Sequence, residues 1–364
     1  MKKILFCIPT LTGGGAERVF TNLMNSLNRS KYNIELVLLH KRGNYISELN
    51  SDIVIHELKS DLKGSFFRLP RVIRKIRPDI VLSTICYMNI VAGFSSFLLR
   101  SMKIKFFGRE SGIPSIRVHY SKSVLNANWL YRFSYRYFDK VICQSSDMRK
   151  EVHDIYRIPF EHIKTINNPI DIALVRKSAV ESTAQGFFND KTNLLAVGRL
   201  HPQKGYDLLL QALRKTHNQN IHLHILGTGE LEKKLKVLTH GLDLSDRVSF
   251  HGFKSNPYPY MMAANLFVTS SIAEGFPNAL LEALSLGCPA VAFDGIGGSK
   301  ELIIPDINGS LVSLGDIDAL AEELDRCSSI QYDREMIAKD IGLRYNIKKI
   351  VGQYEELFDD CATE

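Results

Sequence analysis

The sequence predicts an α/β protein built from two doubly wound parallel-sheet domains in tandem. Short apolar runs alternate with helix-length amphipathic segments along nearly the whole chain, as expected for parallel strands that are joined by helices. The length of 364 residues exceeds the size at which a single hydrophobic core stops growing. A low-apolar stretch near the middle interrupts the alternation, which then restarts and indicates a second domain.

The first domain, residues 1–172, contains seven predicted strands. They cover residues 3–8, 34–40, 53–58, 80–84, 104–107, 140–143 and 163–166, which are short, apolar and mostly β-branched or bounded by turn signals. The uncharged stretch 80–99 includes several Ser and Asn residues. We therefore predict a buried strand and a helix there rather than a membrane-spanning segment.

A linker is predicted at residues 173–192 and a second domain at residues 193–345. The strands of the second domain cover residues 194–197, 222–226, 248–250, 266–269 and 290–293. The last segment, 346–364, is predicted to form a helix that could dock back on either domain, with the first domain as the preferred one. Ligands of such sheets bind at the carboxyl ends of the strands, so two edges that face each other would form a cleft.

Charge is distributed unevenly between the two halves. Residues 1–170 carry 27 basic and 13 acidic side chains, whereas the remainder carries 19 basic and 26 acidic ones, so the first half attracts anions. A composition of 45% hydrophobic and 23% charged residues excludes a disordered or collagen-like chain. The six cysteines form no pair with metal-site spacing, and we predict buried, reduced thiols of a cytosolic protein.

A glycine-rich turn follows the first predicted strand. Gly13, Gly14 and Gly15 stand ahead of a helix pattern, where free backbone N–H groups and the helix dipole favour an anion such as a phosphate. The spacing lacks the later glycine of the dinucleotide-binding fingerprint. A tight turn without a ligand explains these three glycines equally well.

Two cations share a loop after the first strand of the second domain. Arg199 and Lys204 lie five residues apart at a predicted carboxyl edge, in a half of the chain that is otherwise acidic. Two cations so placed suit a pyrophosphate group. The alternative is ordinary solvated loop charge.

The segment from Glu274 to Glu282 is the most informative stretch. Gly275 permits a sharp turn, Pro277 suits the first position of a helix, and Glu282 shares a helix face with Asn278. The two carboxylates can accept hydrogen bonds from hydroxyls on either side of a bound phosphate group. Alternatively, Glu282 faces solvent and Glu274 stabilises the N-terminus of the helix.

Together these motifs resemble the large family of retaining glycosyltransferases with the GT-B fold, similar to glycosyltransferase family 4. The matching segments, in the family's order, are Gly13–Val19, Val197–Leu200 with Lys204-Gly205, Gly227–Glu230, Gly252-Phe253, Glu274–Glu282 and Gly287–Val291. Within the family, the residues most similar to bacterial enzymes that extend polyprenyl-diphosphate-linked glycans are Asn256–Tyr258, Met261 and Glu301-Leu302.

The resemblance implies a role for each matched residue. Arg199 and Lys204 would neutralise the diphosphate of a nucleotide-sugar donor, Glu274 would hold a hydroxyl of the donor sugar, and Glu282 would bind the ribose hydroxyls. The rest of the implied donor-binding set is Gly14 and Gly15, Gly227, Gly252 and Phe253 near the nucleobase, and Gly275, Phe276, Pro277 and Asn278 near phosphate or sugar. The family needs no metal or other cofactor for donor binding, and the sequence contains no metal-ligand cluster.

Glu110 marks a departure from the family pattern. Many members carry a histidine after the fifth strand of the first domain, near the anomeric carbon, and Glu110 occupies that place here. A catalytic glutamate at this position could accept a hydrogen bond from the acceptor hydroxyl or the donor sugar, but an ionised one cannot donate. The alternative is an ion pair with Arg109 or another basic neighbour.

A basic segment with an apolar face lies in the first domain. Arg68, Arg71, Arg74 and Lys75 are interspersed with apolar residues, a pattern typical of helices that contact an anionic membrane surface or, here, an acceptor diphosphate. Pro70 predicts that the helix begins close to it. A helix that packs on the sheet with its charged face in water is a compatible alternative.

The sequence therefore predicts a retaining glycosyltransferase on the cytoplasmic face of a bacterial plasma membrane. It would transfer a hexose or N-acetylhexosamine from a nucleotide sugar, with UDP as the expected nucleotide, to a polyprenyl-diphosphate-linked saccharide in O-antigen, capsule or glycoprotein-glycan assembly. Transfer to a soluble or other lipid acceptor, and a catalytically silent sugar- or lipid-binding relative, stay open as alternatives.

Two further classes are disfavoured. A nicotinamide oxidoreductase would need the dinucleotide fingerprint and an acidic residue at the end of the second strand, where His40-Lys41-Arg42 stands instead. A nucleic-acid-binding protein could use the basic half, but no recognised DNA- or RNA-binding motif supports it.

Overall fold

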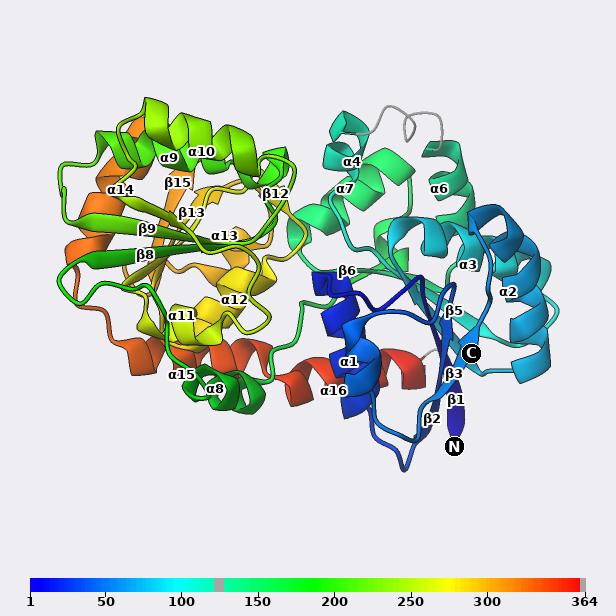
Figure 1. Cartoon of the computed structure of the whole chain (residues 1–364). Coiled ribbons are helices and arrows are strands. Elements are labelled where there is room, and N and C mark those ends of the chain that lie inside the picture. Colours follow the sequence, from blue (N-terminus) through cyan, green and yellow to red (C-terminus); the bar gives the residue numbers. More distant parts are fainter. Residues whose placement is uncertain (121–127, 361–364) are drawn as a thin grey trace. The chain divides into compact units, whose positions relative to one another are not determined.

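The computed structural model describes residues 1–120 and 128–360, and it divides into two compact units (Figure 1). The first unit combines Met1–Pro169 with Ile347–Glu364, and the second is Ile170–Asn346. Each unit has its own parallel sheet, so the predicted fold class of two doubly wound α/β domains is confirmed.

The segment predicted as a linker, residues 173–192, is largely structured. It contains helix α8 (Ile172–Val180), which begins because the Asp171 carboxylate accepts a hydrogen bond from the backbone N–H of Leu174 at 3.0 Å. Val175 and Ala179 are buried on the face that packs against helix α11 (Tyr258–Ala263). The chain therefore passes into the second unit at Ile170, earlier than predicted, because α8 has an apolar face to bury.

The first unit contains a seven-stranded parallel sheet with the strand order β3-β2-β1-β4-β5-β6-β7. Its strands are β1 (Lys2–Ile8), β2 (Tyr32–Leu38), β3 (Val54–Glu57), β4 (Ile80–Thr84), β5 (Lys105–Arg109), β6 (Lys140–Cys143) and β7 (Ile163–Thr165). The central strands β1 and β4 are buried along almost their whole length, with Phe6 opposite Leu82. Burial on both faces explains why these strands read as continuous apolar runs.

Helices cover both faces of this sheet (Figure 1). They are α1 (Gly15–Ser26), α2 (Leu62–Ile76), α3 (Cys86–Leu98), α4 (Pro114–Tyr120), α6 (Asn128–Tyr135), α7 (Ser146–Tyr156) and α16 (Ile347–Asp360), with short 3₁₀ turns at Asn44–Glu48 and Phe160–His162. Helix α2 packs beside α3, and α3 packs beside α6. These three helices therefore form one layer.

Helix α2 begins eight residues earlier than the sequence prediction. The prediction placed its start near Pro70, but Pro70 lies inside the helix. Asp61 caps the helix by accepting a hydrogen bond from the N–H of Gly64 at 2.9 Å, and Leu69 and Ile73 bury its apolar face. An internal proline costs a helix about 3 kcal/mol, so the cap and the buried face offset this cost.

Helix α16 completes the core of the first unit. Ile350, Val351, Tyr354 and Phe358 join the same buried cluster as the apolar side chains of β1 and β2. Polar contacts fix the helix at both edges: the Lys2 ammonium donates to Asp359 at 2.9 Å, and Glu355 accepts from the N–H of Asn28 at 2.9 Å. The C-terminal segment is thus part of the first unit, up to the last described residue.

The second unit contains a six-stranded parallel sheet with the strand order β10-β9-β8-β11-β13-β15. These strands are β8 (Thr192–Val197), β9 (Ile221–Leu226), β10 (Val248–Phe250), β11 (Leu266–Thr269), β13 (Ala290–Asp294) and β15 (Gly309–Ser313). The other helices are α9 (Tyr206–Lys215), α10 (Glu232–Gly241), α12 (Asn278–Ser285), α13 (Ser299–Leu302), α14 (Ile317–Ser329) and α15 (Arg334–Tyr345), with a 3₁₀ turn at Pro202–Lys204. Strand β15 was not predicted, because its sequence is interrupted by glycine and serine.

A two-stranded pairing lies outside the main sheets. Strand β12 (Ala273–Glu274) pairs with β14 (Ile296–Gly297), so Glu274 lies in register with Gly297. A side chain at Gly297 would meet the carbonyl oxygen of Glu274 at 1.6 Å, and its φ of 129° is open mainly to glycine. This close approach fixes the backbone on which the Glu274 side chain stands.

Among the described residues, no helix is both long enough and apolar enough to cross a membrane. The stretch 80–99 divides into β4 and α3, as predicted. Four of the cysteines, Cys7, Cys143, Cys288 and Cys327, are buried and free, and Cys86 is free and half-buried. Cys361 lies outside the described residues.

A histidine cluster packs under the segment that leads into the second sheet. The Phe187 ring stacks on His224 of β9, the Phe188 ring packs at a tilt against His222 of the same strand, and His224 shares a 3.0 Å hydrogen bond with His251. Burial lowers the pKa of His222 to about 4 and that of His224 to about 3. Both imidazoles are therefore neutral in the folded protein near neutral pH.

The cluster predicts a pH-dependent stability. Because the folded pKa values lie below the ordinary value of about 6.5, the unfolded chain binds these protons first, and stability should be full above pH 6.5 and fall as the pH drops towards 4. Each histidine contributes a slope of up to about 1.4 kcal/mol per pH unit. Urea unfolding at several pH values measures this slope.

The matched variants for this test are His222→Gln and His217→Gln, since His217 is exposed. The first should flatten the slope by up to one proton, and the second should leave it unchanged. Equal slopes in all three proteins would contradict the assignment.

Candidate functional site

An ion pair joins two loops at the carboxyl edge of the second sheet. The Lys204 ammonium lies 2.8 Å from the Glu274 Oε1, and the Ser271 hydroxyl donates to the same oxygen at 2.6 Å. Backbone contacts support the pair, because the N–H of Ile272 donates to the carbonyl of Gln203 and the Gln203 amide donates to the carbonyl of Ala273. The sequence-predicted residues Lys204 and Glu274 are therefore in direct contact.

The pair leaves hydrogen-bonding capacity on both partners. Among residues 1–120 and 128–360, no partner is found for Glu274 Oε2, and an ammonium has three donors, of which Glu274 takes one. Both side chains are partly exposed. Burial, together with the charge of Glu274, raises the pKa of the neighbouring Tyr206 phenol, which stays protonated. The site can thus accept one hydrogen bond and donate others to a ligand.

Arg199 is exposed at the tip of the same edge, just after β8. Within the described part of the chain its guanidinium has neither an ion-pair nor a hydrogen-bond partner. The backbone around it is fixed by close approaches: a side chain at Gly227 would meet the carbonyl oxygen of Gly198 at 1.9 Å, and one at Gly205 would meet that of Ser270 at 2.2 Å. These glycines hold the loops after β8 and β9 together and present a cation on rigid backbone.

Glu282 stands on the first turns of α12, which directly follows Pro277. The Tyr258 hydroxyl donates to Glu282 Oε1 at 3.4 Å, and both Glu282 and Asn278 are partly exposed. The Phe276 ring is buried against the Tyr345 ring at a centroid distance of 5.5 Å. Phe276 can reach a ligand only through its backbone.

Gly252 and Phe253 follow strand β10 at the same edge. Gly252 has φ of 66°, and its carbonyl accepts a hydrogen bond from the N–H of Gly227 at 2.8 Å, so the loops after β9 and β10 are linked. The Phe253 side chain is 71% exposed. An exposed aromatic ring beside fixed backbone is suited to stacking on a planar group such as a nucleobase.

In the glycine-rich turn of the first unit, the backbone N–H groups bind the carboxylate of a residue of the same segment, Glu17. The carboxylate of Glu17 accepts hydrogen bonds from the N–H groups of Gly13 at 2.6 Å and Gly14 at 2.7 Å, and from the Thr10 hydroxyl at 3.0 Å. Glu17 is buried and stands three residues after the cap at Gly14. The Gly14 amide, predicted to bind the donor, is thus engaged within the turn. The sequence contains the signal for this arrangement, because a glutamate three residues after a helix cap is the pattern of a capping box.

Glu110 is fully buried in a hydrogen-bonded network at the carboxyl end of β5. Arg117 Nη2 lies 2.7 Å from Glu110 Oε1, the Tyr135 hydroxyl donates to Oε2 at 2.7 Å, and the N–H of Ser111 donates to Oε1 at 2.9 Å. This ion pair with a basic neighbour matches the alternative stated from the sequence, with Arg117 rather than Arg109 as the partner. This buried carboxylate, with both oxygens hydrogen-bonded, positions α4 against β5.

A neighbouring thiol and a strained residue lie beside this network. Ile85 has φ of 68°, a left-handed conformation that is rare for a β-branched residue and is typical of functional edges. Cys86 follows it, and burial raises the pKa of its thiol to about 12. The thiol is therefore protonated, and it lies 3.8 Å from Glu110 Oε1.

The predicted membrane- or acceptor-contacting cations all lie on helix α2. Arg68 donates to the carbonyls of Leu58 and Lys59 at 2.6 Å, so it fastens the helix to the preceding loop. Arg71, Arg74 and Lys75 are exposed.

In the described part of the chain, no group of three or more His, Cys, Asp or Glu side chains could hold a metal ion.

Two α/β units with a paired lysine and glutamate at a carboxyl edge define a GT-B glycosyltransferase. Residues 13–174 match the family model described as Glycosyltransferase Family 4, and residues 179–341 match the model described as Glycosyl transferases group 1. The chain belongs to this glycosyltransferase family. The resemblance inferred from the sequence motifs is confirmed.

Relatives and solved structures agree with this assignment. An N-acetylgalactosaminyltransferase of Campylobacter jejuni, named for a diphospho-undecaprenol acceptor, is 28% identical over 340 residues, which cover 89% of each chain. A lipopolysaccharide 1,6-galactosyltransferase of Salmonella typhimurium is 26% identical over 363 residues, with 95% of each chain covered. The structure of Anabaena HepE with UDP and glucose superposes with a TM-score of 0.83 at 21% identity, covering 99% of this chain and 100% of HepE.

The Glu110 network predicts a large loss of stability when its cation is removed. Arg117→Leu should destabilise the protein by about 3–5 kcal/mol, because an unpaired buried carboxylate remains. Arg136→Leu, at an exposed arginine of the same unit, is the control and should change stability little. Urea unfolding compares them.

The double variant Glu110→Leu/Arg117→Leu should recover part of the loss, since no buried charge is left behind. A cost for Arg117→Leu no larger than that for Arg136→Leu would contradict the role of the pair.

Proposed function

We propose that the protein transfers a sugar from a nucleotide-sugar donor to a polyprenyl-diphosphate-linked saccharide in bacterial surface-glycan assembly, with retention of the anomeric configuration. The observation that carries the proposal is the contact between Lys204 and Glu274 at the sheet edge that also carries Arg199, whose guanidinium has no partner within the described residues. It combines a cationic diphosphate site with a carboxylate acceptor for a sugar hydroxyl. The donor is a hexose or N-acetylhexosamine linked to UDP.

Catalysis in this proposal is mainly electrostatic. As the bond between the sugar and the diphosphate of the donor breaks, negative charge develops on the nucleoside diphosphate and positive charge develops on the sugar. Arg199 and Lys204 stabilise the departing diphosphate, and preorganised charges of this kind are usually the largest catalytic contribution. Glu274 orients the sugar through its free Oε2, because Lys204 and Ser271 already fix its other oxygen.

The nucleoside is held on the adjoining part of the edge. Glu282 binds the ribose hydroxyls, and the exposed Phe253 ring stacks on the base. UDP as the nucleotide is supported by the neighbouring HepE structure, which contains UDP and glucose. The backbone N–H groups of Gly275, Phe276 and Asn278 lie at the start of α12 and suit the phosphate or the sugar.

The acceptor proposal combines a relative with the charge of the first unit. The Campylobacter relative is named for a diphospho-undecaprenol substrate, and helix α2 carries the exposed cations Arg71, Arg74 and Lys75. Basic side chains near an anionic leaflet each contribute about 1 kcal/mol to binding. The protein would therefore work as a peripheral enzyme on the cytoplasmic face of the plasma membrane.

The primary experiment is a screen of the purified protein against nucleotide sugars with a short-chain polyprenyl-diphosphate saccharide as acceptor. Release of nucleotide and nuclear magnetic resonance of the new linkage identify the donor and the retained configuration. Product with an inverted anomeric centre would overturn the retaining mechanism. Nucleotide release that needs no lipid-linked acceptor and proceeds on soluble saccharides would favour the soluble-acceptor alternative.

The diphosphate site predicts a loss of turnover without loss of fold. Arg199→Ala or Lys204→Ala should each reduce kcat by about 10²-fold, as expected when an electrostatic stabiliser of the transition state is removed. Lys233→Ala, at an exposed lysine of α10, is the matched control and should keep its activity. Near-normal turnover in both site variants would place the diphosphate elsewhere.

The two glutamates predict separable effects on binding. Glu282→Ala should weaken UDP binding in calorimetry, since it removes the ribose contact. Glu274→Ala should leave UDP affinity nearly unchanged but abolish most activity with the intact donor, because its partner is the sugar. Glu322→Ala, at an exposed position of α14, controls for charge. Equal losses of UDP affinity in both site variants would contradict these roles.

A further inference from the structure

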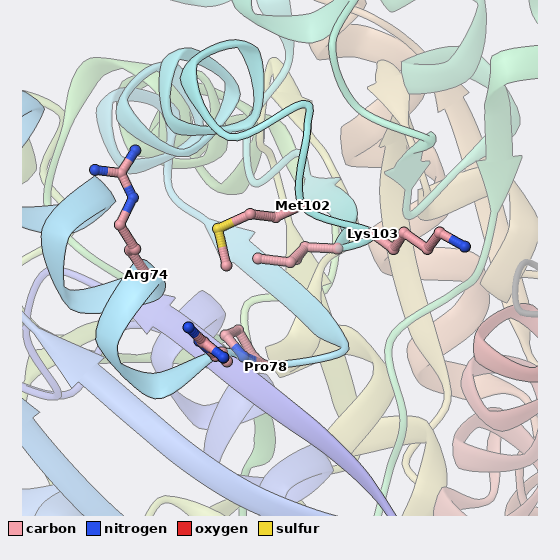
Figure 2. A pocket seen from close by; sticks show the side chains of 6 residues that line it. Arg74, Pro78, Met102 and Lys103 are labelled. Atoms are coloured by element: carbon pink, nitrogen blue, oxygen red, sulfur yellow. The ribbon is translucent and has the colours of Figure 1, made fainter.

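A pocket of about 480 Å³ opens in the first unit, and none of its lining residues belongs to the predicted donor-binding set (Figure 2). Its lining consists of Arg74, Arg77, Pro78, Met102, Lys103 and Ile104. Figure 2 shows the Met102 side chain in the middle of the pocket, with the Arg74 side chain on α2 at one side of it. The pocket thus combines three cations with an apolar floor.

The pocket lies at the amino edge of the sheet. Helix α2 ends at Arg77, whose φ of 51° turns the chain into Pro78 and then β4, and the tight turn after α3 leads through Met102 and Ile104 into β5. Glu110 stands at the other end of β5. Five residues of strand separate the two edges by about 17 Å, so the pocket is distinct from the carboxyl edge.

Basic residues far outnumber acidic ones in the stretch of sequence that forms this pocket, and of these basic residues Lys105 is paired with Asp139 at 3.2 Å. Residues 62–109 contain ten Lys and Arg residues and one acidic residue, Asp79. The Asp79 carboxylate already accepts a hydrogen bond from the N–H of Lys3 at 2.6 Å. Within the described residues, the side chains of Arg74, Arg77 and Lys103 have neither an ion pair nor a hydrogen bond. Their charge is available to an anion.

Apolar side chains line the pocket, and others are exposed on the two helices α2 and α3. Met102 and Ile104 are partly exposed on its floor, and Pro78 is buried. Leu98, at the end of α3, is 46% exposed, and Phe67 on the neighbouring α2 is 67% exposed. Exposed apolar side chains interspersed with cations are typical of surfaces that enter the headgroup region of a bilayer. A free inorganic anion would leave this apolar floor unused.

We propose that this pocket binds the phosphate headgroup of an anionic bilayer phospholipid. Arg74, Arg77 and Lys103 contact the phosphate, and Met102 and Ile104 contact the glycerol and the start of an acyl chain. The inference deepens the membrane docking in the proposed function and rests on it. It adds Arg77 and Lys103 and replaces a diffuse basic surface by a defined site.

The polyprenyl-diphosphate acceptor is a poorer occupant than a bilayer lipid. Its saccharide must reach the donor, whereas the pocket opens at the amino edge, a strand length from Glu110 and the carboxyl edge. A phospholipid has no such requirement. The bound lipid would hold the layer of α2 and α3 against the membrane while the acceptor is used elsewhere.

The decisive experiment uses dihexanoyl phosphatidic acid below its micelle concentration, titrated into the full chain by calorimetry. The wild-type protein should bind it saturably at one site, and Arg77→Gln/Lys103→Gln should weaken the affinity at least tenfold. Lys150→Gln/Lys164→Gln removes the same charge from two exposed lysines of the first unit and should bind normally. Met102→Ser should weaken binding of the lipid, because it removes part of the floor.

Three outcomes would overturn the site. They are no saturable binding to the wild type, equal loss in the pocket and control variants, and full displacement of the lipid by an equal concentration of inorganic phosphate. If the double variant fails to fold by circular dichroism, Lys103→Gln alone serves, since Lys103 is exposed and has no side-chain partner among the described residues.

Vesicles separate this inference from the membrane proposal. Sedimentation with phosphatidylcholine vesicles containing phosphatidylglycerol should fall as salt shortens the Debye length, which is about 10 Å at 0.1 M. If the wild type ignores these vesicles at low salt, membrane docking itself fails and with it the bilayer as the source of the ligand. If the wild type binds and the pocket and control variants fall equally, docking stands and the pocket fails.

Discussion

The candidate site depends on the ion pair between the Glu274 carboxylate and the Lys204 ammonium. One oxygen of this carboxylate is held by Lys204 and Ser271, and the Glu274 backbone is held by the pairing of β12 with β14, where only a glycine fits at position 297. Lys204 in turn belongs to a turn that is bound to the loop after β11. A charged residue on mobile loops would lose entropy on binding a ligand, whereas this one is fixed in advance.

The first unit uses the same device at its own carboxyl edge. Glu17 closes the glycine-rich turn by accepting from two backbone amides, and Glu110 fastens α4 to the end of β5 through Arg117. Both carboxylates are buried, and each is surrounded by enough donors to offset the cost of removing its charge from water. The carboxyl edge of the first unit is therefore preformed by internal carboxylates.

The sequence was sufficient to predict the fold, but not these internal contacts. Buried parallel strands such as β1 and β4 are apolar throughout, so their positions are visible in the sequence, whereas β15 contains glycine and serine and is recognised only by its pairing with β13. Arg199, Lys204, Glu274 and Glu282 come from loops and a helix start at one edge, which topology predicts.

The sequence could not predict which hydrogen-bond donors would surround each carboxylate in the fold. Glu110 was expected to face the reaction, and Glu17 was only a family motif residue, because hydrogen-bond partners such as Tyr135 lie many positions away. The start of α2 was misplaced for a related reason. Pro70 is a local signal against helix, and the burial of Leu69 and Ile73 that overrides it is a tertiary contact.

The contacts in the structure show where the excess positive charge of the first half lies and which of its cations are paired. At the carboxyl edge Arg117 is neutralised by Glu110, while at the amino edge Arg74, Arg77 and Lys103 face solvent around an apolar floor. Cations that lie close together repel one another, and this repulsion lowers the stability of the fold. The clustering of Arg74, Arg77 and Lys103 around one pocket therefore favours a role for their charge in binding. Arg117 is thus paired where it fixes α4 to β5, whereas Arg74, Arg77 and Lys103 have no partner within the described residues and surround a pocket where an anionic partner can bind.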